Sequence, residues 1–596
     1  MQARSYLATA LALGLTSGMV WAQGTQAPVP VKGDRGVAIA DAGVPRPTTQ
    51  PCVVSLYSEV KFNAHGDPTS RAAHPHTWDY APPAKCAGPW SKVVLEADFS
   101  VNAGRQYDRT ASLWLDGVNL YFGTTQEPSA DVGPHWHIER DVTDYASLFR
   151  KAGQGQMILN NWVSAKYTGV IKGSARLVFY PAAPKAKPTR PADQVMGLVG
   201  AGNGHPVGVQ DGTQALSRTF TLPRNVERAY LDVIAQSQAV DEQWYMCIDD
   251  ADVKRTRNYS LGPPNAGDPL EQCGGGNYRE VAVSIDGQPA GRAPVYPWTY
   301  TGGVNPLLWR PTPDIQTLNF KPYRVDLTPF ASVLDDGKPH TVSVRVLGAH
   351  DFFSVAANLL IYRDHGRKVL TGKLIRNTLA MDPARLKPEI SRHWSSALNG
   401  HIDTVQHGDY MIEGELQTSH GPVRTLVSQQ SSFANRQHYK HPDKATWDQV
   451  IDMDTQVSST VTTQREGSTV THRTHVHYPL RVDVHKVVKP DGNFSADITM
   501  KQGYQRQRQR MQGGHKAFHS TLDNQLVSQA SAEFNAGGTA LLGTHGQHGN
   551  QVYRFSDSLG SCYARRIATR DQAVTKVSSG QGCPGGHNHL VAGSKL

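Results

Sequence analysis

Short segments in which apolar and polar residues alternate dominate this chain, and glycine and proline separate them. One such segment carries an apolar residue at every second position: Leu95, Ala97, Phe99 and Val101. Because the side chains of a strand point alternately to its two faces, this pattern predicts half-buried strands. Many strands of this length, with frequent Gly and Pro between them, predict an all-β protein built from β-sandwiches.

Two Asp-Gly dipeptides mark β-hairpins. Asp116-Gly117 stands between two alternating segments, and Asp286-Gly287 follows a third. Asp and Gly readily adopt the positive φ angles that a two-residue turn demands, so we expect a hairpin at each dipeptide.

The length of 596 residues exceeds what one hydrophobic core supports, so we expect several domains. A linker rich in Pro, Ala and charge, AAPKAKPTRPAD, occupies residues 182–193 and has no apolar periodicity. It separates two regions of similar strand rhythm, residues 46–181 and 194–365. Residues 366–596 are strand-rich as well. The sequence therefore predicts two consecutive β-sandwich domains and a third, β-rich domain whose role it does not reveal.

The N-terminus has the features of an export signal. Arg4 precedes an apolar run over residues 6–20, and the tripeptide VWA at its end fits a cleavage site. The run is short for a membrane span, and no later segment reaches the length of one. Residues 1–22 are therefore predicted to be a signal peptide, and the mature protein is expected to be secreted or periplasmic. The Pro- and Gly-rich residues 23–45 are expected to be disordered.

Six cysteines fit an oxidising compartment, and no CxxC motif supports redox catalysis or a zinc ribbon. Pairing neighbours along the sequence closes three loops of modest size, although other connectivities remain open. The disulfides predicted in this way are Cys52–Cys86, Cys247–Cys273 and Cys562–Cys583.

The formal charge of +9 is small for this length and no basic helix concentrates it, so nucleic acid is not expected as a partner. The densest basic cluster is QRQRQR, whose alternation places Arg506, Arg508 and Arg510 on one face of a strand. Because arginine is usually exposed, we expect this face to be solvated.

The 25 histidines raise the question of a metal site. His475, His477 and His485 share one strand face, opposite the apolar residues of that strand, and are expected to be solvated. The motifs HExxH and GxSxG and a phosphate-binding loop are absent from the sequence. The sequence therefore predicts no metal, no other cofactor and no serine nucleophile.

Carboxylates next to aromatic residues and arginines are better candidates for chemistry. Asp108 and Arg109 lie in RQYDRTASLWL, where a strand begins. The segment DEQWY holds Asp241 and Glu242 beside Trp244, and adjacent carboxylates in an aromatic setting favour a raised pKa. The run GGVNPLLWRP offers a pair suited to stacking on a sugar and donating to its oxygens: Trp309 and Arg310. Composition alone does not rank these candidates.

Long blocks around these residues resemble the plant-type peptide:N-glycosidase A family. In order, they are GPWSKVVLEADFSVNAGRQYDRTASLWLDGV, HIERDVTDYASL, YTGV, DEQWY, YREVAVSIDG, TGGVNPLLWRP and an SCY segment, between Cys52 and Cys583. A more distant resemblance is to peptide:N-glycosidase F, which has two jelly-roll domains with the active site at their interface. The resemblance implies two consecutive jelly rolls here and, together with the signal peptide, a secreted member of bacterial style.

The same resemblance implies catalytic residues. DRTASLWL looks similar to the DRYANVYV segment that carries the main catalytic aspartate of peptide:N-glycosidase F. This implies that Asp108 is the principal catalytic carboxylate and that Arg109 binds substrate. Glu242 is the match for a second carboxylate that precedes a tryptophan, but the spacing differs by one residue, so Asp241 remains a rival.

The remaining residues of the implied site are substrate contacts. A third glutamate of the distant relative falls near Asn160 in ILNNW, and Glu127 in TTQEP is an alternative source of that acid. The other residues implied to bind substrate are aromatic or basic: Trp162, Trp244, Trp309 and Arg310.

The implied function is hydrolysis of the bond between asparagine and the proximal N-acetylglucosamine of N-glycoproteins or N-glycopeptides. This releases the intact glycan and converts Asn to Asp. Asp108 and Glu242 would serve as base and acid, in an order that stays open, and arginine would stabilise the oxyanion without a metal. A monomer is expected. The alternatives are a non-catalytic lectin-like protein and a two-carboxylate glycoside hydrolase.

Overall fold

The computed structural model describes residues 36–63, 75–183, 190–200, 202, 204–252, 274–379, 387–396, 399–443, 445–536, 538 and 540–596. The predicted signal peptide lies outside these ranges. Strands make up nearly all of the regular structure, which confirms the all-β prediction. Within the described ranges, no helix combines the length and the apolar character that crossing a membrane requires.

The first eight strands form two four-stranded sheets, in the orders β1-β8-β3-β6 and β2-β7-β4-β5. This is the strand order of a jelly roll, in which two Greek keys enclose one core. The strands are β1 (Cys52–Phe62), β2 (His76–Tyr80), β3 (Trp90–Val101), β4 (Thr110–Leu115), β5 (Val118–Thr124), β6 (His135–Asp141), β7 (Gly153–Leu159) and β8 (Ile171–Pro181).

The next strands repeat this order, as β10-β17-β12-β15 and β11-β16-β13-β14, with β9 added beside β17. The resemblance to a protein with two consecutive jelly rolls therefore predicted this topology correctly. The strands are β9 (Gln194–Gly197), β10 (Val207–Val209), β11 (Leu216–Thr221), β12 (Val226–Gln238), β13 (Glu280–Ile285), β14 (Gln288–Pro294), β15 (Tyr323–Asp326), β16 (Pro339–Leu347) and β17 (Phe352–Arg363).

The rest of the chain forms a single antiparallel sheet of eleven strands, most of them consecutive neighbours. Its central strands reach about twenty residues each. The strands are β18 (Thr371–Asn377), β19 (Glu389–Trp394), β20 (Gly400–Thr418), β21 (Gly421–Lys440), β22 (Thr446–Arg465), β23 (Ser468–Val488), β24 (Phe494–Gln512), β25 (His515–Phe534), β26 (Leu541–Asp557), β27 (Cys562–Arg570) and β28 (Ala573–Ser579).

The described helical segments have three or four residues each. They are η1 (Ala84–Cys86), η2 (Thr143–Tyr145), η3 (Leu148–Arg150), η4 (Ala239–Asp241), η5 (Trp244–Met246), η6 (Pro306–Trp309), η7 (Thr328–Phe330), α2 (Ala331–Leu334) and η8 (Pro584–Gly586).

Both predicted hairpins are present. Asp116 and Gly117 have φ angles of 47° and 77° between β4 and β5, and Asp286 and Gly287 have φ angles of 51° and 77° between β13 and β14. Two consecutive residues with positive φ turn the chain in the sense that matches the twist of the flanking strands.

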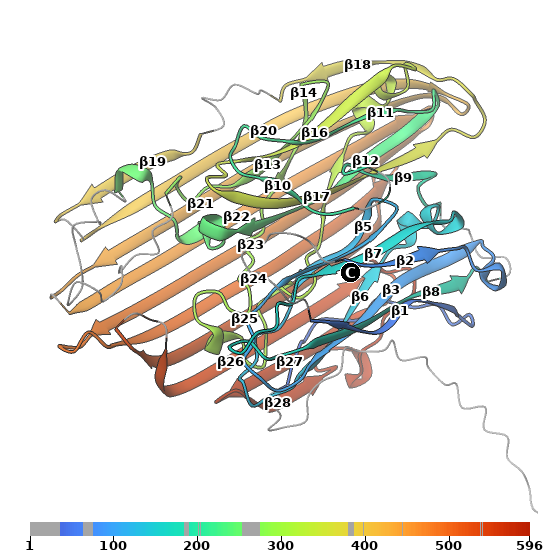
Figure 1. Cartoon of the computed structure of the whole chain (residues 1–596). Helices are drawn as coiled ribbons and strands as arrows, with labels where there is room; N and C mark the ends of the chain where they lie inside the picture. Colours follow the sequence, from blue (N-terminus) through green and yellow to red (C-terminus); the bar gives the residue numbers. More distant parts are fainter. Residues whose placement is uncertain are drawn as a thin grey trace, which may run out of the picture.

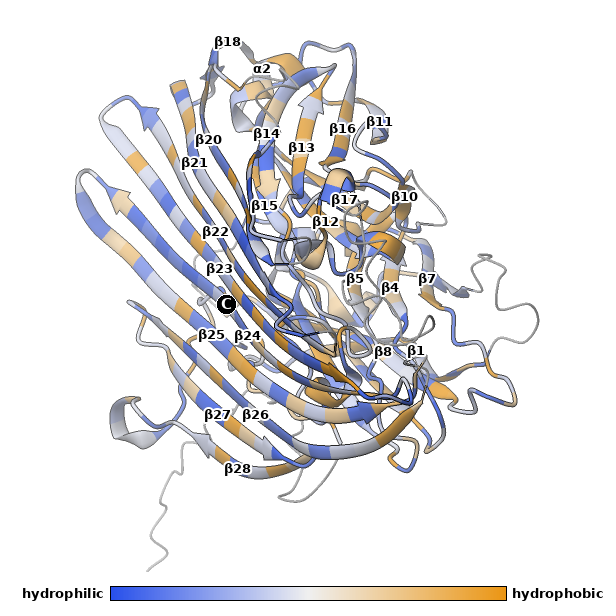
Figure 2. Ribbon diagram, turned by 90° about the vertical axis from the view of Figure 1, so that its left-hand side faces the viewer, coloured by the Kyte–Doolittle hydropathy of each residue, from blue (hydrophilic) through white to orange (hydrophobic). Residues whose placement is uncertain are grey.

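The large sheet lies along one side of both jelly rolls, as a curved wall in Figure 2 and as the long strands in Figure 1. Apolar residues at every second position of its strands face the jelly rolls, and residues of the second jelly roll and of the sheet form one apolar core. In β23 this buried row consists of Val476, Tyr478, Leu480 and Val482. His475, His477 and His485 lie on the outer face and contact polar residues of β22: Ser458, Asp454 and Asp448.

The arginines of QRQRQR do not form the predicted solvated face. They lie on the inner face of β24, and Arg506 is only 8% exposed. Arg506 and Arg508 line a partly open cavity between the sheet and the jelly rolls. The alternation predicted their common face correctly, but it could not show which face the rest of the protein covers.

Residues 36–46 form a strap between the large sheet and the first jelly roll, in contrast to the disorder expected over residues 23–45. The backbone N–H of Ala40 donates to Gln551 Oε1 of β26 at 2.8 Å. Further along, Arg46 Nη2 pairs with Glu96 and Glu139 of the first jelly roll at 2.6 and 2.7 Å. Long-range contacts therefore hold a segment whose composition is typical of disorder.

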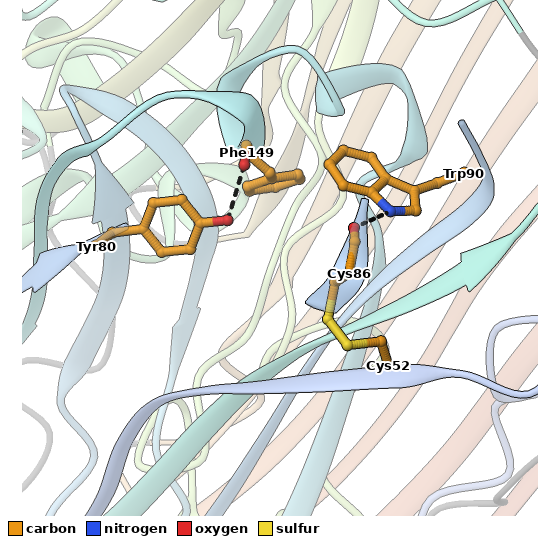
Figure 3. The surroundings of a disulfide bond; sticks show 5 residues. All are labelled: Cys52, Tyr80, Cys86, Trp90 and Phe149. Carbon is orange, nitrogen blue, oxygen red and sulfur yellow. Dashed lines mark hydrogen bonds between the residues drawn. A yellow bond between two sulfur atoms is a disulfide. The ribbon is translucent and has the colours of Figure 1, made fainter. Parts of the chain in front are cut away.

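Two of the predicted disulfides are formed, Cys52–Cys86 and Cys562–Cys583. The first ties β1 to η1, and Figure 3 shows Trp90 Nε1 donating to the carbonyl oxygen of Cys86 at 2.8 Å beside it. Cys273 lies outside the described residues, so the Cys247–Cys273 pairing stays a prediction.

Arg46→Gln is expected to reduce the free energy of unfolding by about 3–5 kcal/mol, because it removes the cation of a buried ion pair. The matched control is Arg176→Gln: Arg176 pairs with the same Glu96 but is 46% exposed, so about 1 kcal/mol or less is expected. Urea denaturation followed by tryptophan fluorescence measures both. Equal losses would contradict a structural role for the strap.

Candidate functional site

The β4–β5 hairpin brings two carboxylates together at its open end. Its pairing continues past the strands, because Thr125 N donates to the Arg109 carbonyl at 2.9 Å and Arg109 N donates to Thr125 Oγ1 at 3.0 Å. This register places the backbone N–H of Asp108 3.4 Å from Glu127 Oε2. The Asp116-Gly117 turn fixes the register, so a local sequence signal determines the spacing of the two acids.

A loop of the second jelly roll closes over these acids. Thr301 Oγ1 accepts from the backbone N–H of Glu127 at 2.8 Å, and Gly302 N donates to Asp108 Oδ2 at 2.9 Å. A Cβ atom at Gly302 would lie 2.5 Å from Glu127 Oε2 and 3.1 Å from Asp108 Oδ1. A larger residue at this position would therefore displace the two carboxylates from their present places.

Burial raises the pKa of both acids. For Glu127, burial and the neighbouring charge of Asp108 raise the pKa to about 7, while Arg310 acts in the opposite direction. Burial also raises the pKa of Asp108. Arg310 Nη2 lies 3.6 Å from Glu127 Oε1, and Arg310 Nε donates to the Glu127 carbonyl at 2.9 Å. Arg310 therefore lies beside the Glu127 carboxylate, and its role in binding substrate stays a prediction.

Arg109 follows Asp108 in the sequence, but its guanidinium group is buried and contacts other residues of the protein. It is 6% exposed, its guanidinium lies 3.6 Å above the ring centre of Tyr107, and its Nη2 donates to the Trp162 carbonyl at 3.4 Å. Burial lowers the pKa of Arg109 to about 10. Half-buried Tyr107 packs edge-on against Tyr167, so two tyrosines stand beside the carboxylates.

Glu242 reaches the same region from the second jelly roll. It follows η4 directly, is half-buried, and its Oε1 accepts from Gln243 Nε2 at 2.8 Å. Burial, together with the charges of Glu242 and Asp108, raises the pKa of Tyr300, so both carboxylates act on this one phenol. Asp108 and Glu242 therefore both lie close enough to Tyr300 to act on it electrostatically, and the catalytic role of each stays a prediction.

Asp241, the predicted rival of Glu242, has a structural role. It is fully buried, and its Oδ1 accepts from Arg279 Nε at 3.1 Å and from Arg279 Nη2 at 2.5 Å. Its Oδ2 accepts from three successive backbone N–H groups at 2.8–3.0 Å: those of His350, Asp351 and Phe352. Both oxygens are thus occupied, and Asp241 is not available to a substrate.

Two tryptophans predicted to contact substrate belong to the core. Trp244 and Trp309 are each 1% exposed, and Trp309 Nε1 donates to the Gly303 carbonyl at 2.9 Å. Neither ring offers a face to a sugar, so this prediction was wrong for both. Trp162 is 9% exposed, and Asn160 is half-buried just beyond β7.

Polar residues on the inner face of the large sheet donate hydrogen bonds to two segments of the second jelly roll, the one that follows Glu242 and the one that precedes Thr301. Asn435 Nδ2 donates to the Tyr245 carbonyl at 2.8 Å, and Gln437 Nε2 donates to the Cys247 carbonyl at 3.1 Å. Gln502 Nε2 donates to the Pro297 carbonyl at 2.7 Å. The large sheet therefore holds the loops of the site in place, a role that was not predicted from the sequence. Asn and Gln at strand positions where the alternating pattern predicts apolar residues could have indicated it.

Gly302 and Thr301 were missed as well. The segment TGGVNPLLWRP contains both residues, but the aspartate and glutamate that lie against Gly302 come from the first jelly roll. Among the described residues, no group of three or more His, Cys, Asp or Glu side chains is arranged to hold a metal ion.

The carboxylates and arginines described above lie where the two jelly rolls meet. Residues 52–378 match the model of the family described as peptide N-acetyl-beta-D-glucosaminyl asparaginase amidase A. The chain belongs to this family. The match ends just beyond β18, so most of the large sheet lies outside it.

Individual relatives agree with the family match. The peptide-N4-(N-acetyl-beta-glucosaminyl)asparagine amidase A of Prunus dulcis is 29% identical over 375 residues, which cover 60% of this chain and 62% of the relative. The chain thus spans less than two thirds of the relative's length. Solved structures with similarity include a recombinant peptide: N-glycanase F (14% identity, 52% of this chain, 96% of that one, TM-score 0.34) and PNGF-II (12% identity, 53% and 66%, TM-score 0.34).

Asp241→Asn is expected to reduce the free energy of unfolding by about 3–5 kcal/mol, because it leaves Arg279 buried without its counter-charge. Glu242→Gln changes a half-buried residue and should alter stability by about 0.5 kcal/mol or less. The urea concentration at the midpoint of unfolding, measured for both variants, distinguishes the structural acid from its neighbour. Similar midpoints would contradict the structural role of Asp241.

Proposed function

We propose that this protein hydrolyses the amide bond between asparagine and the proximal N-acetylglucosamine of N-glycoproteins or N-glycopeptides. The observation that carries the proposal is the convergence of Asp108, Glu127 and Arg310 under the Gly302 backbone, at the junction of the two jelly rolls. Amide hydrolysis needs a base for water, a proton donor for the leaving nitrogen and a cation or N–H near the developing oxyanion. These residues can supply all of them.

In the proposed mechanism Asp108 takes a proton from water, which adds to the side-chain carbonyl carbon of the substrate asparagine. The bond from this carbon to the nitrogen breaks, and Glu127, protonated near neutral pH because of its raised pKa, donates a proton to that nitrogen. Glu242 binds the water or a sugar hydroxyl from the opposite jelly roll. The products are an aspartate in the peptide and an aminated glycan that leaves intact.

Family membership supports the substrate class, since the named relative from Prunus dulcis is an asparagine amidase. Tyr107 and Tyr167 replace the buried tryptophans as the proposed aromatic contacts for the sugar, because both are half-buried beside the acids. We further propose that the protein is secreted and acts as a monomer. The export signal and the two disulfides support secretion.

Two other functions remain as alternatives. A lectin would use the same jelly rolls to bind the glycan without cleaving it. A glycoside hydrolase would use two carboxylates to cut within the sugar core and would leave N-acetylglucosamine on the asparagine. The raised pKa of Glu127 favours an enzyme over a lectin, because mere sugar binding does not call for a carboxyl that titrates near neutral pH.

Digestion of a singly glycosylated peptide in water enriched in heavy oxygen tests the reaction. An amidase returns a peptide whose new aspartate carries the label, together with a glycan that retains both core N-acetylglucosamines. A glycoside hydrolase leaves sugar on an unlabelled peptide, and a lectin returns the glycopeptide unchanged. Mass spectrometry distinguishes the three, and either of the last two results refutes the proposal.

Asp108→Asn should lower kcat by about 10²–10⁴-fold, the usual effect of losing a catalytic acid or base, while the protein still folds. Asp98→Asn is the matched control: Asp98 is an aspartate of the same jelly roll, half exposed on β3, and should keep wild-type turnover. Glycopeptide turnover and circular dichroism of both variants are the measurements. Normal turnover of the folded Asp108→Asn variant would place the active site elsewhere.

The pH dependence of kcat should have an alkaline limb near pH 7, because Glu127 must be protonated to act as donor and its pKa is raised to about 7. The charge of Arg310 lowers this pKa, so Arg310→Gln should move the limb to higher pH. Glu127→Gln should remove the limb and lower kcat. An alkaline limb unchanged in both variants would show that another group is the proton donor.

A further inference from the structure

A partly open cavity of about 330 Å³ lies apart from the proposed active site. The strap, both jelly rolls and strands β24–β26 of the large sheet contribute to its lining, while Asp108, Glu127 and Glu242 do not. Its walls carry a high density of charge. Six cations line it: Arg140, Lys321, Arg324, Arg506, Arg508 and Lys595.

Most acids of the cavity are already neutralised by partners of their own. Asp144 accepts from Arg324 and Lys595, and Asp232 pairs with Arg324 at 2.7 Å. Asp141 pairs with Lys92 at 2.9 Å. Two of the six cations, Arg324 and Lys595, therefore already have a carboxylate partner.

The other acids are held in the same way or lose their charge. Glu139 pairs with Arg46 at 2.7 Å and with His137 at 3.2 Å. Burial raises the pKa of Asp314 to about 7 and raises that of Asp41, whose Oδ1 accepts from amide groups. These acidic side chains therefore leave little negative charge for the remaining cations. Leu596, the last residue of the sequence, also lines the cavity, beside the Lys595 carbonyl.

Four cations of the cavity have no carboxylate within 4 Å among the described residues: Arg140, Lys321, Arg506 and Arg508. Arg506 and Arg508 donate to the backbone carbonyl of Lys595, at 3.3 and 3.5 Å. Arg140 donates to the Phe320 carbonyl at 2.5 Å. Arg506 is only 8% exposed, and its Nε has no hydrogen-bond partner in the described part of the chain.

These charges act on one another across the cavity. Burial and the charge of Arg506 lower the pKa of Arg508 to about 9. Arg140 and Arg506 are each only 8% exposed, whereas the side chain of Lys321 reaches solvent. Burying like charges together is unfavourable unless an opposite charge joins them. Guanidinium groups match the geometry of carboxylate and phosphate oxygens, with which they form paired, charge-assisted hydrogen bonds.

We propose that this cavity binds a small molecule bearing an oxyanion, a carboxylate or a phosphate, between Arg506 and Arg508 on one side and Arg140 and Lys321 on the other. Its volume is at the lower end of small-molecule sites and suits a single acidic sugar or a small organic acid. The cations come from β6, from the loop before β15 and from β24, so the ligand would join both jelly rolls to the large sheet.

Binding is tested with two probes, inorganic phosphate and glucuronate, at constant ionic strength, with glucose as the uncharged control. Thermal unfolding should shift to higher temperature in a saturable manner with one or both anions, but not with glucose. A shift with phosphate alone identifies the free ion as the ligand, and a shift with glucuronate alone identifies an organic carboxylate. No saturable shift with either anion overturns the proposal.

Arg508→Gln should weaken Kd for the active probe by about ten- to hundredfold, as expected for the loss of a charge-assisted hydrogen bond. Arg510→Gln is the matched control, because Arg510 lies on the same inner face of β24 but outside the cavity, and it should bind as the wild type does. If Arg508→Gln fails to fold, Lys321→Gln, on another element, tests the same loss of affinity for the probe. Equal weakening by Arg510→Gln, or none by the cavity variants, overturns the proposal.

Glycopeptide turnover separates this site from the proposed amidase site. Arg508→Gln should hydrolyse the glycopeptide at the wild-type rate, since the cavity contains none of the proposed catalytic residues. Loss of oxyanion binding with full turnover is the expected result. Binding that competes with glycopeptide substrate would place the anion in the active site and overturn the assignment of a separate cavity.

Discussion

The apolar inner face of the eleven-stranded sheet has to be covered, and the rest of the structure depends on how this happens. A sheet with one apolar face is stable only when another layer buries it. Here two jelly rolls provide that layer, and residues of the second jelly roll and the sheet form one core. Inner-face amides such as Asn435 and Gln502 would be costly to bury alone, but they bond to carbonyls of the loops that carry the candidate site. The contacts that cover the sheet therefore also fix the site.

The raised pKa values of Asp108 and Glu127 depend on the packing of the second jelly roll against the first. The β4–β5 hairpin alone would hold Asp108 and Glu127 at an open strand end, where water would keep both carboxyls near their ordinary pKa. The Thr301–Gly302 loop excludes that water and supplies a backbone N–H to Asp108. Since Gly302 has no side chain, the loop approaches closely enough to raise both pKa values without displacing either carboxylate.

Features decided by neighbouring residues could be predicted from the sequence. The hairpins at Asp116-Gly117 and Asp286-Gly287 follow from local φ preferences, and the strand pattern indicated an all-β chain. The family resemblance placed Asp108 at the junction of two jelly rolls. These predictions needed no knowledge of what packs against each strand.

Features decided by distant contacts could not be predicted in this way. Asp241 and Glu242 are adjacent and chemically alike, and only the position of Arg279 separates a structural acid from a candidate catalytic one. Trp244 and Trp309 lie in the short helical turns η5 and η6, which are too short for a periodic pattern to indicate burial. Alternation placed the arginines around Arg506 on one face, but which face is covered depends on the jelly rolls.

The strap has a consequence for how the protein reaches its native state. Ala40 bonds to a residue 511 positions further along the chain, so the strap cannot pack until β26 exists. At about 5–20 residues per second, synthesis of that stretch takes roughly half a minute to two minutes. During this time the first jelly roll can fold, but the contact between the strap and β26 has to wait. The strap is therefore fastened only after nearly the whole chain has been made.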